Sequence, residues 1–364
     1  METTRLCRLA KDGIIRKAGT HPNTTNEEGD IMTEANPLVD AQHAFINAVS
    51  HRGVGGEDCP LTETLGRTLF ETIHAPEDSP PYPRAIVEGF LVHPQETQSA
   101  SDDTPVHFTI AGKVEPGDES CPQLNAGQAI ETATGAIVPD GQMAIVRMWE
   151  AQRDDDGFSI TRPFPPGFFI EAQGCDIRQG ELVVNAGAVL TAEHIGTFAS
   201  LGLDTLRVAR RPRVTVFSSG NEVIPHTQAA QPGTIRDCNH PMLTAAITAA
   251  GACPTFGGIM NDDFESFVIA LKQALAGSDM VVISGGTAVG GRDFISDLIR
   301  EVGELLIDGV PMKSGRPLIM GMAGSKPIVA VAGHPPEALR GFRLFGEPAI
   351  GKLLGREAER PQDS

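Results

Sequence analysis

Several features that mark particular classes of protein are scarce in this sequence of 364 residues. Lys and Arg together number 29, against 47 Asp and Glu, so the formal net charge is -18. A surface of that sign repels a phosphate backbone, which excludes a general nucleic-acid binder but still allows a local pocket for a small anion. The sequence has one Trp and one Tyr, and no interleaving of aromatic and basic residues that would favour RNA binding.

Cysteine pairs, long apolar runs and common catalytic motifs are also missing. The six cysteines form no C-x-x-C pair, so the sequence indicates neither a disulfide framework nor a structural zinc site. No apolar stretch approaches the ~20 residues of a membrane span, and no secretory signal is present. We therefore expect a cytoplasmic protein without a membrane or nucleic-acid partner. Neither a G-x-S-x-G elbow nor an H-E-x-x-H helix occurs.

Patterning in the first half predicts a tail and two domains. Residues 1–35 are polar and lack a sustained period, so we expect a disordered tail. Helical spacing appears in "DAQHAFINAVSH" and again in "LTETLGRTLFETIHA", where Leu61, Leu65, Leu69 and Ile73 are four apart. A proline-rich stretch, "PEDSPPYPRA", follows. We assign residues 36–86 with 163–210 to a helical and extended linker domain, and residues 87–162, with "VHFTIAG", "QAIETATG" and "MAIVRMWEA", to a β-rich domain.

The second half has the rhythm of an α/β domain. Between residues 211 and 355, continuous apolar strands such as "VTVFSS" and "MVVIS" alternate with helical patterns such as "DDFESFVIALKQALAG". Strands of this kind are buried on both faces, which predicts a three-layer domain around a mostly parallel sheet. The sequence thus predicts a multi-domain α/β protein that ends in a short tail, residues 356–364.

Glycine-rich loops follow the strands of this α/β domain, at the edge where parallel sheets bind ligands. They are "SSGNEV", "GTIRDCNH", "SGGTAVGGRDF" and "AGHPPEA". The third loop matches neither a P-loop nor a dinucleotide fingerprint. Two interpretations remain open: a tight turn into a helix that starts near Asp293, or a loop whose backbone N–H groups bind a phosphate.

Charged residues at the same edge also allow two interpretations. Glu222, Asp262 and Asp293 follow strands and could converge on a hard cation such as Mg²⁺, or they could be three separate surface acids. Lys313 and Arg316 in "MKSGRP" could hold a phosphate or a molybdate-like oxyanion, or they could form a solvated basic turn.

The ordered series of motifs resembles the molybdopterin molybdenumtransferase family, the MoeA family that includes the matching domain of gephyrin. It comprises "TATGAIVPDGQMAIVRMWE", "FSSGNEV", "GTIRDCNHPML", "VVISGGTAVGGRDF", "MKSGRPLIMG" and "VAGHPPEA", within a resemblance that covers about Pro37 to Leu354. The resemblance implies a homodimer that inserts molybdate into adenylylated molybdopterin and releases AMP in a Mg²⁺-dependent step. A molybdoenzyme is a further expected partner.

The resemblance also implies roles for individual residues. It gives Glu222, Asp262 and Asp293 catalytic and metal-binding roles, and it gives Glu88 and Asp176 catalytic roles. The residues expected to bind substrate are Thr134, Ser218, Gly220, Ser284, Gly285, Gly286, Gly290, Lys313, Arg316, Gly333 and Pro335.

Departures from the family pattern leave two functions open. Glu88 and Asn221 stand where the family has Asp, Arg316 replaces Lys, and His334 replaces Asn. The resemblance ends near Leu354, so we expect the family's small C-terminal β-domain to be missing. The chain is then either an active molybdenumtransferase with a divergent site, or a non-catalytic binding or carrier protein for molybdopterin or the molybdenum cofactor.

Overall fold

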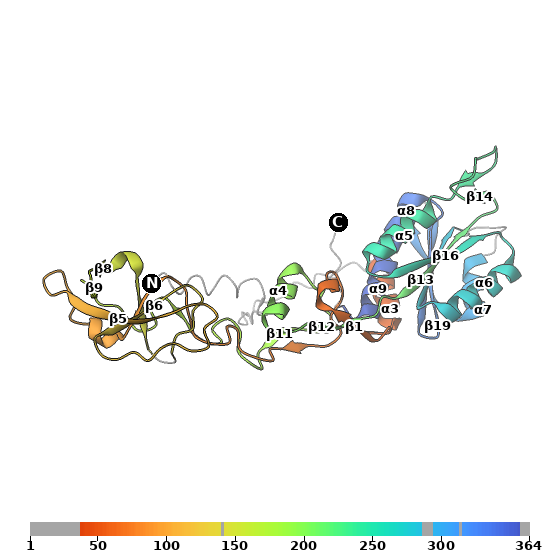
Figure 1. The fold of residues 1–364 in the computed structure, drawn as a ribbon. Helices are drawn as coiled ribbons and strands as arrows, with labels where there is room; N and C mark the ends of the chain where they lie inside the picture. Colours follow the sequence, from red (N-terminus) through yellow and green to blue (C-terminus); the bar gives the residue numbers. More distant parts are fainter. Residues whose placement is uncertain (1–36, 140–141, 286–293, 313–314, 357–364) are drawn as a thin grey trace, which may run out of the picture. The chain divides into compact units, whose positions relative to one another are not determined.

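A computed structural model describes residues 37–139, 142–285, 294–312 and 315–356. Two compact units are present: Ile73–Val183 with Ser200–Gly202 form one, and the rest of the described chain forms the other. Figure 1 gives the order of the elements along the chain. The division into linker, β-rich and α/β domains remains a prediction. Within the described residues, no helix is both long and apolar enough to cross a membrane.

The larger unit is built on a six-stranded sheet with the order β16-β13-β17-β20-β19-β18. Strands β13 (Arg213–Ser219), β16 (Cys253–Met260), β17 (Met280–Gly285) and β20 (Lys326–Val331) are parallel to their neighbours in this group. Strands β18 (Glu304–Met312) and β19 (Gly315–Ala323) add an antiparallel edge. The predicted mostly parallel sheet is confirmed, although β18 lies where no strand was expected.

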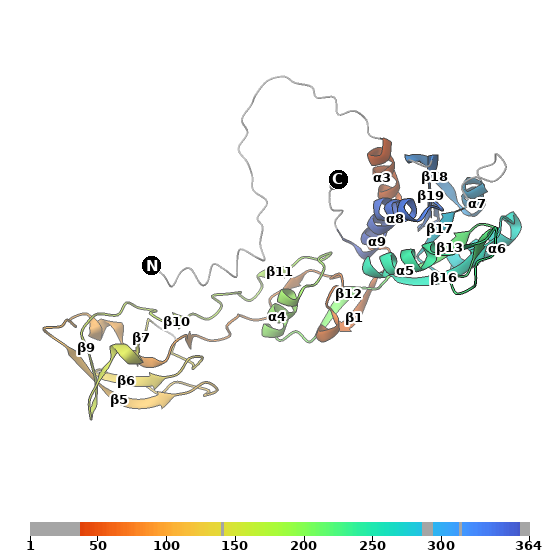
Figure 2. The same cartoon turned by 90° about the horizontal axis from the view of Figure 1, so that it is seen from above.

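Helices cover both faces of this sheet, as Figure 2 shows. Alternate residues of β17 point to opposite layers: Met280 and Val282 belong to one core cluster, and Val281 and Ile283 to the other. The first cluster contains side chains of α3 (Pro37–Ala48), α5 (Asn239–Ala249), α8 (Pro335–Gly341) and α9 (Glu347–Leu354). The second contains side chains of α6 (Phe264–Gly277) and α7 (Phe294–Val302). The three-layer arrangement follows from strands that are apolar on both faces.

The helix expected from Leu61 to Ile73 is wrong. The chain makes only a short 3₁₀ turn, η1 (Leu61–Glu63). The Thr64 hydroxyl donates to the Leu61 carbonyl at 2.7 Å, and Gly66 turns the backbone with φ +72. Beyond it the backbone pairs with the 187–190 segment, as in the Leu69 N–H to Ala188 O bond at 2.8 Å. The i, i+4 apolar spacing was therefore overridden by side-chain-to-backbone bonding and a left-handed glycine.

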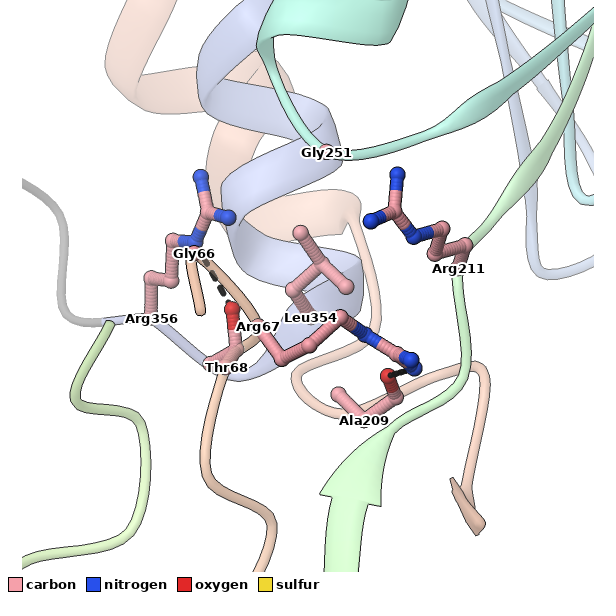
Figure 3. A pocket seen from close by; sticks show the side chains of 8 residues that line it. All are labelled: Gly66, Arg67, Thr68, Ala209, Arg211, Gly251, Leu354 and Arg356. Atoms are coloured by element: carbon pink, nitrogen blue, oxygen red, sulfur yellow. Dashed lines mark hydrogen bonds between the residues drawn. The ribbon is translucent and has the colours of Figure 1, made fainter. Parts of the chain in front are cut away.

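Strands β1 (Gly56–Pro60) and β12 (Thr205–Ala209) pair antiparallel nearby, and α4 (Ala192–Ser200) precedes β12. Arginine side chains form hydrogen bonds between segments in this part of the larger unit, as Figure 3 shows. Arg67 donates to the Ala209 carbonyl at 2.9 Å, and Arg356 donates to the Thr68 hydroxyl at 2.9 Å and to the Ala250 carbonyl at 3.1 Å. The cavity between them is about 10 Å³, room for no more than one water.

The smaller unit contains a six-stranded sheet with the order β7-β4-β6-β5-β9-β8. Its strands are β4 (Gly89–Val92), β5 (Val106–Val114), β6 (Gln128–Thr132), β7 (Ala144–Arg147), β8 (Gln152–Arg153) and β9 (Gly157–Ile160). Phe90 and Val92 pack into one core cluster and Leu91 into another, so both faces of β4 are covered. The strands expected in "VHFTIAG", "QAIETATG" and "MAIVRMWEA" are confirmed.

Candidate functional site

Three strands of the large sheet end side by side at one edge. In β13 and β17, Ser218 lies opposite Ser284 and Ser219 opposite Gly285, and Ser284 in turn lies opposite Val331 of β20. All three strands are parallel, so the loops that leave them meet at the same edge. These strand ends and loops, together with the loop after β16, line an open pocket of about 630 Å³. It is lined by Ser218, Ser219, Gly220, Glu222, Val223, Ile235, Arg236, Asp237, Cys238, Asn239, Asp262, Ser284, Gly285, Gly333, His334 and Pro335.

Two glycines at the strand ends are required by the backbone. Gly285 has φ +94, and a Cβ placed on it would lie 2.4 Å from the Ser219 carbonyl oxygen. A Cβ on Gly220, at φ +148, would lie 2.9 Å from a carboxylate oxygen of Glu222. Side chains at these positions would occupy the space through which β13, β17 and the Glu222 side chain approach one another.

The buried side-chain amide of Asn239 forms hydrogen bonds to two other segments at this edge of the sheet. Asn239, at the start of α5, donates through Nδ2 to the Ser284 hydroxyl and to the Gly333 carbonyl, both at 2.7 Å. The Ser284 hydroxyl donates to the Ala332 carbonyl at 3.2 Å. These bonds fix the end of β17 and the loop after β20 against the first turn of α5.

Three acids line the pocket, and two of them, Glu222 and Asp262, come from different loops after strands of the sheet. Glu222 is exposed, while Asp262 is half-buried and contacts Asn221. Asn221 Nδ2 donates to Asp262 Oδ2 at 2.8 Å, and the Asp262 backbone N–H donates to Asn221 Oδ1 at 3.2 Å. Asp262 Oδ1 is buried without a partner. Asn221 therefore orients the Asp262 carboxylate and leaves one oxygen available, without adding a second negative charge.

Unpartnered polar atoms are concentrated at this pocket. In the described part of the chain, the buried side-chain oxygens without a hydrogen-bond partner belong to Ser218, Ser219, Asp237, Asn239 and Asp262. All five residues line the pocket. A buried polar group without a partner costs about 1–3 kcal/mol, so such groups are few in native proteins and need an explanation. Their concentration here indicates a site that a ligand completes.

Eight predicted site residues meet in this pocket. Those that meet are Ser218, Gly220, Glu222, Asp262, Ser284, Gly285, Gly333 and Pro335. The predicted residues Gly286, Gly290, Asp293 and Lys313 lie outside the described residues. Arg316 is on β19, where its guanidinium donates to the Gly309 carbonyl at 2.7 Å, and it is not among the lining residues.

Thr134, Glu88 and Asp176 belong to the smaller unit. Thr134 and Glu88 are exposed, and Asp176 is half-buried. Burial and the neighbouring Glu171 carboxylate raise the pKa of Asp176, and the Arg84 guanidinium opposes them. Glu171, Cys175 and Asp176 place ligand atoms within 4.8 Å of one another, the one such group of three among the described residues. Their hydrogen bonding includes Arg84 Nε to Glu171 Oε2 at 2.6 Å.

The sequence interpretation missed eight lining residues, among them Ser219, Arg236, Asp237 and Asn239. The last three lie in "GTIRDCNH", a loop that was recognised as a motif without a role for any one residue. An acid two residues before an Asn at a helix start was the available signal, because such residues bond backbone N–H groups. Arg236 is the one Lys or Arg among the described residues that line the pocket.

Comparisons with known proteins place these features in a family. Residues 35–202 match a family model described as the MoeA N-terminal region (domain I and II), and residues 215–352 match a probable molybdopterin binding domain. A molybdopterin molybdenumtransferase of Staphylococcus epidermidis is 29% identical over 303 residues, 83% of this chain and 72% of that protein. One of Staphylococcus aureus is 27% identical over the same shares. A crystal structure of a molybdopterin biosynthesis moea protein from Pyrococcus horikosii has a TM-score of 0.79 and 32% identity, covering 89% of this chain and 81% of that one.

Proposed function

The chain belongs to the family of molybdopterin molybdenumtransferases, and from that premise we propose that it inserts molybdate into adenylylated molybdopterin. In this proposal AMP is released in a Mg²⁺-dependent step, and the protein acts in the cytoplasm in molybdenum cofactor biosynthesis. The names of the curated relatives support the reaction class. The second family model supports the choice of the α/β half, because residues 215–352 contain all the loops that line the pocket.

The observation that carries the proposal is the set of unpartnered oxygens in the pocket. Its five members come from β13, the α5 start and the loop after β16. A volume of about 630 Å³ is in the range of small-molecule and cofactor sites. These oxygens come from distant parts of the sequence, lie in one pocket and have no hydrogen-bond partner in the protein. A bound ligand would supply the missing partners.

The acids in the pocket fit a hard cation. Mg²⁺ prefers oxygen ligands, and Asp262 Oδ1 is a buried oxygen without a partner. Asp262 and the exposed Glu222 would hold the ion, together with Asp293, to which the resemblance gives the same role. When bound, Mg²⁺ would offset the negative charge of the phosphate groups. Without it, Glu222, Asp237 and Asp262 would repel a phosphate, because Arg236 is the one Lys or Arg in the described lining.

The residues of the pocket position the substrate rather than react with it. Gly285 and Gly220 let the strand ends and the Glu222 carboxylate approach one another closely, which fixes the groups that line the pocket. Asn221 holds the Asp262 carboxylate in one orientation through two hydrogen bonds. Fixed, preorganised groups of this kind stabilise charge in a transition state without reorganising during the reaction.

The smaller unit has a part in the proposal as well. Thr134, Glu88 and Asp176 are expected site residues, and they belong to the unit that does not contain the pocket. By resemblance, the β-rich domain of one subunit covers the site of the other, so we propose a homodimer. A molybdoenzyme that receives the product is proposed as a further partner.

The alternative function is a carrier that binds molybdopterin or its molybdenum form without catalysis. The presence of Asn221 in place of the family's aspartate favours this function, because the site then has one negative charge fewer than the family pattern provides. A carrier needs the pocket and its unpartnered oxygens, but it does not need the acids to stabilise a leaving phosphate.

Release of AMP separates the two functions. Purified protein is mixed with adenylylated molybdopterin, Mg²⁺ and molybdate, and AMP is measured by chromatography. The transferase predicts AMP release that falls ~100-fold or more in Asp262→Asn. Glu265→Gln, which changes an exposed acid in the first turn of α6, is the matched control and is expected to be unaffected. Tight binding without AMP release from the wild-type protein would establish the carrier instead.

A further inference from the structure

The orientation of the Asn239 amide is settled by its neighbours. Its two close contacts are the Ser284 hydroxyl and the Gly333 carbonyl, each at 2.7 Å from Nδ2. A flipped amide would place Oδ1 against the Gly333 carbonyl, and two oxygens without a shared proton repel each other. Both N–H bonds of the amide are therefore used inside the protein, and the unpartnered atom is the acceptor Oδ1.

Asp237 presents a second acceptor two residues earlier. The His240 backbone N–H, in the first turn of α5, donates to Asp237 Oδ1 at 3.0 Å. Asp237 Oδ2 is unpartnered, and the residue is only 4% exposed. Asp237 and Asn239 both line the pocket. The start of α5 therefore offers the pocket two oxygens that can only accept hydrogen bonds while Asp237 is ionised.

The two hydrogen-bond acceptors, Asp237 Oδ2 and Asn239 Oδ1, are best matched by a ligand that donates hydrogen bonds. A phosphate or a molybdate oxyanion brings further acceptors and negative charge, so it is disfavoured beside Asp237. The proposed function already assigns the cation to Asp262 and Glu222, so Asp237 and Asn239 are left for a group that donates hydrogen bonds. The aminopyrimidinone edge of a pterin carries an amino group next to a ring N–H, and a carboxylate can accept from both.

We propose that Asp237 and Asn239 bind the aminopyrimidinone edge of the pterin ring, with Asp237 Oδ2 and Asn239 Oδ1 accepting its N–H groups. The inference rests on the proposed function, because that function supplies a pterin as the ligand. It assigns the ring to the α5 start, and it leaves the phosphate and the cation to the part of the pocket near Glu222 and Asp262. Selectivity for a pterin then comes from an amino group that Asp237 recognises.

Two small fluorescent rings test the assignment directly. Pterin has the 2-amino group, whereas lumazine has a carbonyl oxygen there and an N–H at the adjacent N1, on the same bicyclic frame. Both are titrated into the full-length protein without Mg²⁺ or nucleotide, and their own fluorescence reports binding. Because a buried hydrogen bond to a charged group is a strong one, we expect the wild-type protein to bind pterin at least ~10-fold more tightly than lumazine.

Asp237→Asn is the informative variant, because it keeps the oxygen that accepts the His240 N–H and turns the other acceptor into a donor. We expect it to lower the preference for pterin to less than about threefold, since the new amide can donate to the lumazine carbonyl. Glu265→Gln is the matched control and should keep the wild-type preference. Thermal melts of both variants check that the fold survives.

Three results would overturn the assignment. They are a wild-type protein that binds the two rings equally, a wild-type protein that binds neither ring up to their solubility limits, and an Asp237→Asn variant with an unchanged preference. None of them decides whether AMP is released from adenylylated molybdopterin, so failure of this inference and failure of the proposed function are distinguishable.

Discussion

Replacing Gly285 with alanine tests how closely the strand ends of the pocket approach each other. The new Cβ would lie 2.4 Å from the Ser219 carbonyl oxygen, about 1 Å closer than ordinary van der Waals contact. The residue would also keep φ +94, a conformation that costs an L-residue roughly 1–2 kcal/mol. Relieving the overlap requires β13 and β17 to separate, which costs a further ~1–3 kcal/mol. We expect Gly285→Ala to lower the free energy of unfolding by roughly 2–5 kcal/mol.

Urea unfolding measures this loss, with Gly277→Ala as the matched control. Gly277 is the last residue of α6, has an ordinary φ, and has no atom within 4 Å of the position that a Cβ would take. The control should leave the stability unchanged or raise it by about 0.4–1 kcal/mol, because alanine restricts the unfolded chain. A Gly285→Ala protein that unfolds within about 0.5 kcal/mol of the wild type would refute the close approach of these strands.

Two further substitutions test the electrostatics of the larger unit. Asn221→Ala is expected to reduce AMP release about tenfold by freeing the Asp262 carboxylate, and to have no further effect in an Asp262→Ala background; additive losses in this double-mutant cycle would contradict the positioning role. Burial raises the pKa of Asp279, but hydrogen bonds from Arg210 and from the backbone N–H of Arg213 outweigh it and hold the pKa below 3.8. A carboxyl group whose pKa is lowered by folding stabilises the folded state at pH values above its ordinary pKa of 3.8. This stabilisation is lost as the pH falls through the lower pKa of the folded protein. Arg210→Ala should therefore cost about 1–3 kcal/mol at pH 7, and less under acidic conditions; a loss that is independent of pH in urea unfolding would argue against the ion pair.

The strands of the α/β sheet were predictable because their apolar runs are uninterrupted. β17 is buried along its whole length, and "VVIS" could not have been a surface segment. β18 was missed because Gly309 and Pro311 interrupt its pattern, and its pairing with β19 shifts register three times. The helix wrongly expected from Leu61 has the right spacing, but Gly66 and the Thr64 hydroxyl end the turn. Local bonding of this kind leaves no periodic signal.

The candidate site was predictable at the level of loops and only partly at the level of residues. The carboxyl ends of parallel strands must meet at one edge, so glycine loops after β13, β17 and β20 identified the pocket. The roles of Asp237 and Asn239 could not be read in this way. Their significance lies in which atoms have no partner, and that depends on Ser284 and Gly333, which are 45 and 94 residues from Asn239 in the sequence.

Hydrogen–deuterium exchange tests the central claim most directly, that the strand-end loops form one pocket for adenylylated molybdopterin. Exchange is compared with and without this ligand, and Mg²⁺ is omitted so that turnover is avoided. We predict slower exchange in the segments that line the pocket, 218–223, 235–239 and 333–335, and unchanged exchange in α6 beyond its first turn. Protection confined to other segments, or absent from all of them under saturating ligand, would contradict the account.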